Sequence, residues 1–108
     1  MTTRELIETA KYYQSILEKA GIEAMDGSGA QQTVKQEAEP LACPYHATLI
    51  VPLQLAYCGW MLRQMRDMDK SHADKFVRWL CFVQGVFWAA GLLTVREARD
   101  HIRPLVKK

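Results

Sequence analysis

A thiol and an imidazole stand at Cys-x-x-His spacing in this chain, at Cys43 and His46. Both side chains are good zinc ligands, so the pair could supply half of a tetrahedral site. The remaining cysteines and histidines stand singly and would have to converge through the fold: Cys58, His72, Cys81 and His101. No second pair is close in sequence, and no acid or oxyanion feature lies near Cys43 or Cys58 to activate a nucleophile. We therefore expect no metal, no cofactor and no catalytic residue, and we interpret the chain as non-enzymatic.

Basic residues gather around an expected turn between two helices, next to a tryptophan. Such a group could bind phosphates of a nucleotide or a nucleic acid. Asp67, Asp69 and Asp74 are interleaved with it, which favours a solvated face with ion pairs, and no recognition-helix pattern is present. The candidate binding residues are Trp60, Arg63, Arg66, Lys70, Lys75 and Arg78.

Three tryptophans recur at helical spacing and have two interpretations. Trp60, Trp79 and Trp88 could form a box that stacks on a ligand, because aromatic faces grip bases and cations. At this spacing tryptophan more often belongs to a core or a subunit interface, which we favour.

A first helix is expected at the N-terminus. Thr2 and Glu5 form a capping box, and apolar residues follow at spacings of three and four up to Gly21, which suits a left-handed cap. We divide the chain into an N-terminal amphipathic helix at 1–25, a flexible linker at 26–40 and a helical core at 41–108, all within a single domain. The linker is predicted because this stretch is rich in small and polar residues and lacks periodicity.

Three further helices are expected in the core. The first covers roughly 48–68, and either begins near Val51 or is kinked at Pro52, since proline interrupts a helix. The next begins at His72 behind a capping box of Ser71 and Asp74.

This third helix carries a heptad-like stripe and a second apolar row beside it, so we expect it to be buried nearly all round. Gly85 is expected to mark a close crossing with another helix. A short last helix, from Val95 to about Arg103, follows a capping box of Thr94 and Glu97 and is stopped by Pro104. No stretch alternates with the period of a strand, so the predicted fold is all-α: a small bundle of three main helices plus a short C-terminal helix.

Composition limits the function classes. The net charge of +2 demands no attraction to nucleic acid or membrane, and three cysteines fit no disulfide framework, which favours the reducing cytoplasm. The N-terminus has no apolar core of a signal peptide. Apolar residues make up 49 % of 108 residues, so part of the apolar surface is expected in a subunit or partner interface. The apolar stretches 49–62 and 79–93 could instead form a membrane hairpin, but both are short and interrupted, so we expect no membrane partner.

The run from Arg78 to Pro104 contains Arg-Trp-Leu-x-Phe-Val-Gln-Gly followed by Thr-x-x-Glu-x-Arg-Asp. It resembles a C-terminal segment of small uncharacterised helical proteins of tailed phages and prophages. The resemblance covers about a quarter of the chain and carries over no functional residues. It implies a phage accessory protein of the host cytoplasm, typically acting by binding, for example as an inhibitor of a host defence system through protein contact or ligand sequestration. We expect a homo-oligomer with a host partner; the alternatives are a nucleotide or nucleic-acid binding module and a membrane-active lysis accessory protein.

Overall fold

Four α-helices and one short 3₁₀ turn account for most of the described chain, which comprises residues 2–27 and 46–106 of the computed structural model. The helices are α1 (Thr3–Lys19), α3 (His46–Met65), α4 (Ala73–Ala89) and α5 (Val95–Val106), with η1 (Lys70–His72) before α4. These residues include no strand, so the all-α prediction is confirmed. Most of the predicted linker, together with Cys43, lies outside the described residues.

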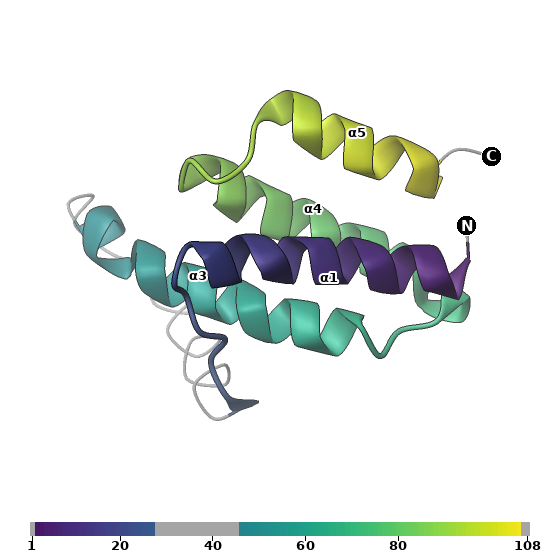
Figure 1. The fold of residues 1–108 in the computed structure, drawn as a ribbon, viewed down its shortest axis with the longest axis horizontal. Helices are drawn as coiled ribbons and strands as arrows, with labels where there is room; N and C mark the ends of the chain where they lie inside the picture. Colours follow the sequence, from purple (N-terminus) through teal and green to yellow (C-terminus); the bar gives the residue numbers. More distant parts are fainter. Residues whose placement is uncertain (1, 28–45, 107–108) are drawn as a thin grey trace.

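The helices run up and down along the long axis of the molecule (Figure 1). Both α1 and α4 run in one direction, while α3 and α5 run in the other, and the two labelled chain ends lie at the same end of the bundle. In this order α4 has a helix on each side, α3 and α5, while α1 runs along α3. The arrangement leaves one side of α4 without a neighbouring helix among the described elements.

Both ends of α1 follow the predicted local signals. The Thr2 side chain accepts a hydrogen bond from the Glu5 amide at 3.2 Å. At the other end Gly21 has a φ of 76°, and the Ile22 amide donates to the Leu17 carbonyl at 3.0 Å, which is the Schellman arrangement. The chain then crosses to α3, where the Met25 amide donates to the Ala56 carbonyl at 3.0 Å.

Helix α3 begins and ends earlier than predicted. It starts at His46, so of the two alternatives the start near Val51 is excluded, and Pro52 lies inside the helix. It ends at Met65 rather than at 68, because Asp67 and Met68 donate their amide hydrogens three residues back instead of four. Such tightening satisfies carbonyls at the end of a helix.

The predicted cap of α4 is wrong. Ser71 and Asp74 form no capping box; instead the Asp69 side chain accepts from the Ser71 amide at 2.9 Å and from the Ser71 hydroxyl, and so caps η1. These hydrogen bonds, with a further one to His72, lower the pKa of Asp69. The Asp lies one residue before the turn, where its oxygen reaches the second amide of the 3₁₀ helix.

The start of α5 is as predicted and its end is not. Thr94 and Glu97 form the reciprocal box, with bonds of 3.0 and 3.1 Å, which lowers the pKa of Glu97. Pro104 lies inside the helix, which continues to Val106. A proline ring is compatible with helical φ and costs one backbone hydrogen bond here, so the last residues remain helical.

The core takes one stripe from each of α1, α3 and α4. Tyr13, Phe76 and Phe87 are its largest fully buried side chains. The core therefore includes the N-terminal helix. Its buried hydrophobic residues are Leu6, Ala10, Tyr13, Leu17, Leu55, Cys58, Met61, Leu62, Met65, Met68, Phe76, Leu80, Val83, Phe87 and Leu93.

Two expectations for α4 are corrected. The helix is not buried all round, because Phe82 and Trp88 are 48 % and 59 % exposed. A Cβ added at Gly85 would meet nothing within 4 Å, so no described helix crosses there. The close approach lies at Gly59 on α3, where an added Cβ would lie 2.9 Å from Ala24.

Candidate functional site

The cysteine and histidine residues do not come together as a metal site in the part of the chain that the structure describes. Cys58 is fully buried in α3, and desolvation raises its pKa to about 12, so its thiol is protonated and unreactive. Cys81 is exposed on α4. Among residues 2–27 and 46–106 no three His, Cys, Asp or Glu residues come together as metal ligands, and the predicted pair partner Cys43 lies outside these ranges.

A polar network joins three helices in the interior. The Gln84 amide donates to the Tyr13 hydroxyl at 2.9 Å and to the Ala98 carbonyl at 3.0 Å, and the Tyr13 hydroxyl lies 2.6 Å from Nδ1 of His101. Burial raises the pKa of Tyr13 to about 12 although the Gln84 hydrogen bond lowers it. The network was not predicted; the single glutamine on an apolar helix face was the only signal. Its hydrogen bonds link α1 and α5 to α4, so the network has a structural role.

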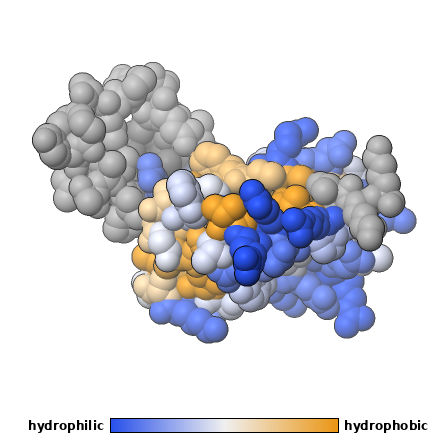
Figure 2. Space-filling model, turned by 90° about the horizontal axis from the view of Figure 1, so that it is seen from above, coloured by the Kyte–Doolittle hydropathy of each residue, from blue (hydrophilic) through white to orange (hydrophobic). Residues whose placement is uncertain are grey.

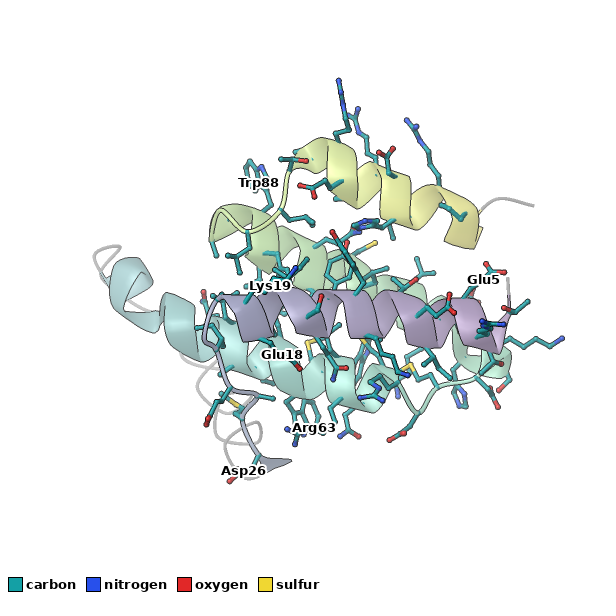
Figure 3. All side chains as sticks on the ribbon, in the orientation of Figure 1. Glu5, Glu18, Lys19, Asp26, Arg63 and Trp88 are labelled. Atoms are coloured by element: carbon teal, nitrogen blue, oxygen red, sulfur yellow. The ribbon has the colours of Figure 1, made fainter. Side chains whose placement is uncertain are left out.

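The predicted binding residues do not form one site. Arg63 of α3 and Arg66, which directly follows α3, line a hollow of about 430 Å³ against α1, and Arg66 donates to Gln14 at 3.3 Å. Glu18 and Glu23 line the same hollow, so two carboxylates share it with the two guanidinium groups (Figure 3 labels Glu18 on α1 and Arg63 on α3). The two negative and two positive side chains that line this hollow therefore cancel in net charge.

The other predicted residues lie elsewhere. Lys70 begins η1, where its backbone amide donates to the Thr3 hydroxyl at 3.2 Å. Arg78 is exposed on α4. Lys75 and Trp60 instead both contact Trp79 of α4: the ammonium lies 5.1 Å from the Trp79 ring centroid, and the two indole centroids are 6.3 Å apart.

We call Tyr57, Trp60, Trp79 and Lys75 the aromatic edge. Tyr57 stacks on Trp60 with centroids 5.8 Å apart and an interplanar angle of 27°. All three rings are half-buried, so each packs on the core with one part and faces outward with another. The cation over Trp79 adds an attraction to the ring face. The edge thus presents ordered aromatic surface beside a positive charge.

We call Cys81, Phe82, Gly85, Trp88 and Ala89 the α4 face. All five are exposed, and no charged residue occurs between 79 and 95. A hollow of about 530 Å³ lies between this face and α3, where Phe82 makes an edge contact with Tyr57 at 6.5 Å. The α4 face therefore continues into the aromatic edge.

On the face seen in Figure 2, apolar surface lies toward one end of the bundle. Figure 2 shows it toward the end at which α4 ends and α5 begins, with hydrophilic surface toward the opposite end. Trp88 lies near that end of α4, where the chain turns toward α5 (Figure 3). The second apolar row of α4 was predicted from the sequence, but it was expected to be buried. Two adjacent apolar rows look alike in sequence, so the spacing of the residues does not show which row is exposed.

None of the helices in the described ranges is both long and apolar enough to cross a membrane. Comparison with protein-family models, with curated proteins and with solved structures finds no match to this chain.

Proposed function

We propose that the protein is a non-enzymatic phage accessory protein of the host cytoplasm that binds a host protein, such as a component of a defence system, through the aromatic edge. The observation that carries the proposal is the surface of three contacting rings, in which Tyr57 stacks on Trp60, Trp60 packs at a tilt on Trp79, and the Lys75 ammonium lies over Trp79. Tryptophan and tyrosine dominate the binding energy of protein interfaces, because they offer large rigid surfaces. The phage context rests on the resemblance of the segment beginning at Arg78.

The chemistry of the edge defines the partner. An apolar side chain fits the ring faces, and a carboxylate next to it would pair with Lys75, whose ammonium already lies at 5.1 Å from an indole. Arg78, exposed one turn of helix from Lys75, extends the positive charge. We therefore expect a partner segment that combines a large apolar residue with Asp or Glu.

Capture from an extract of the native host tests this proposal. The tagged wild-type chain should retain a host protein, and Lys75→Glu should reduce its recovery at least tenfold, because the reversed charge would repel the carboxylate. Lys11→Glu is the matched control, since Lys11 is exposed on α1, away from the edge, and it should leave recovery unchanged. Equal recovery with all three chains, or no retained protein, would refute the proposal.

A second candidate is sequestration of a nucleotide or nucleic acid in the hollow between α1 and α3. Arg63 and Arg66 line it together, which favours an anion, whereas Glu18 and Glu23 oppose one. Titration with nucleotides and a single-stranded oligonucleotide should then show affinity that falls steeply with salt and is lost in Arg66→Glu. Binding that is insensitive to salt, or unchanged in the variant, would eliminate this candidate.

A further inference from the structure

We propose that the α4 face binds a second copy of this chain, with two antiparallel α4 helices crossing at Gly85. The inference stands apart from the host partner, since it concerns a different surface and needs no second protein. It begins from Phe82 and Trp88, large side chains that the core leaves 48 % and 59 % exposed on the same helix. Gly85 lies midway between them, with open space where a side chain would be.

Charge allows two such faces to meet. The segment from 79 to 95 contains no charged residue, so two α4 helices can be desolvated against each other without burying an unpaired ion. A surface helix normally carries charges on its outer side. Their absence from the outer side of α4 between residues 79 and 89 is what an interface with an equally apolar surface requires.

The shape of the face matches itself under two-fold symmetry. At 100° and about 1.5 Å per residue, Phe82 and Ala89 lie on one flank of Gly85, and Cys81 and Trp88 lie on the other. An antiparallel two-fold pair brings each flank against the same flank of the second copy, with heights reversed about Gly85. Phe82 then packs over Ala89 of the other copy, and Trp88 packs over Cys81. Each large side chain meets a small one.

The two exposed aromatic side chains supply part of the area that a dimer interface buries. An aromatic residue has roughly 150–250 Å² to bury, so half-exposed Phe82 and Trp88 each contribute about 100 Å². Two copies supply about 400 Å² from these side chains alone, roughly a quarter of a standard interface of about 1,600 Å². The small residues between them and the neighbouring hollow of about 530 Å³ add further contact surface.

The helix ends are complementary as well. In the antiparallel pair, exposed Arg78 reaches the height at which the other α4 ends, near its Gly91. This end carries a partial negative charge and has no basic residue in its last turn. The same symmetry places α3 of both copies on one side, because Phe82 contacts Tyr57 on that flank. The dimer would therefore present both aromatic edges on one side.

Gly85→Arg separates dimerisation from folding. A side chain at this position meets nothing within 4 Å, so the variant should still fold. Its melting temperature should be independent of protein concentration, whereas that of the dimeric wild type should rise with concentration. Light scattering at micromolar concentration should give the dimer mass for the wild type and half of it for the variant. Gln64→Arg, which adds the same side chain at an exposed position of α3, should remain dimeric.

Cross-linking tests the crossing point. Gly85→Cys, in a chain with Cys43→Ala and Cys81→Ala, places a thiol on the two-fold axis and should form a covalent dimer under mild oxidation, whereas Lys11→Cys in the same background should not. A monomeric wild type, a dimeric Gly85→Arg, or equal cross-linking at both positions would overturn the proposal. A wild-type monomer whose capture of a host protein is abolished by Gly85→Arg would also overturn it, and would assign the α4 face to that host protein.

Discussion

Removing one side chain of the Tyr13–Gln84–His101 network should weaken the association of three helices. Tyr13→Phe keeps the buried ring and its tilted packing on Phe87, with centroids 5.5 Å apart, and deletes only the hydroxyl. Gln84→Met keeps the length of the side chain and deletes the amide that donates to Tyr13 and Ala98. Both changes act on hydrogen bonds rather than on the volume of the core.

The expected loss in the free energy of unfolding follows from the hydrogen bonds that each substitution removes. Tyr13→Phe leaves one N–H of buried Gln84 and Nδ1 of His101 without the hydroxyl, at a cost of about 2 kcal/mol. Gln84→Met removes two bonds but leaves the Tyr13 hydroxyl with His101, so we expect about 1 kcal/mol. Since the two residues share a bond, the double variant should lose about 1 kcal/mol less than the sum.

Urea and thermal unfolding of the four proteins measures this coupling. For a domain of this size, 1 kcal/mol corresponds to roughly 4 °C in the melting temperature. Tyr12→Phe is the control, because this neighbouring residue is 45 % exposed, and its change should be within about 0.5 kcal/mol. Additivity of the two substitutions within about 0.3 kcal/mol would refute the idea that the network acts as a unit.

Three further predictions concern single groups. Burial raises the pKa of Tyr13 to about 12, above the unfolded value of about 10, so the stability contributed by its neutral form should be complete below pH ~10 and lost as pH rises toward 12, as followed by denaturation and by tyrosinate absorbance. Gly59→Ala should destabilise the fold by about 1–3 kcal/mol, because its Cβ would lie 2.9 Å from the Ala24 backbone; unfolding no easier than that of the wild type would contradict the close contact. In a Cys43→Ala chain, a thiol reagent should label exposed Cys81 at once and Cys58 only on unfolding, and rapid labelling of two thiols would show that Cys58 is accessible.

Helix caps were predicted correctly from the sequence where only one residue could cap the helix end. The Thr2 N-cap, the capping box of Thr94 and Glu97 and the glycine cap at Gly21 each involve residues within five positions of each other, so the chain itself determines them. The box at Ser71 was wrong because Asp69, two residues earlier, offers a better acceptor to the same turn. Sequence spacing alone cannot rank two caps that compete for one amide.

The two helical glycines show where tertiary structure decides. Gly59 and Gly85 each interrupt an apolar helix, and the sequence favoured Gly85 as the site of close approach. The contact lies at Gly59 because the segment after α1 folds back and bonds to α3 through Met25 and Ala56. That path depends on where α1 ends relative to α3. The spacing of apolar residues within either helix contains no information about this relative position. The candidate binding residues were separated for the same reason: Arg63 and Trp60 are close in sequence but face different neighbours.

The exposed side of α4 follows from the geometry of a small bundle. A helix that is apolar around most of its circumference needs neighbours on every side, and α1, α3 and α5 cover the sides that carry Phe76, Leu80, Val83 and Phe87. The remaining side gains nothing from folding of the single chain, yet it keeps Phe82 and Trp88 where polar residues would be more soluble. If Gly85→Arg folds as a stable monomer, folding does not require this side to be apolar. The absence of charge on the α4 face is then explained by association of two chains rather than by folding of one.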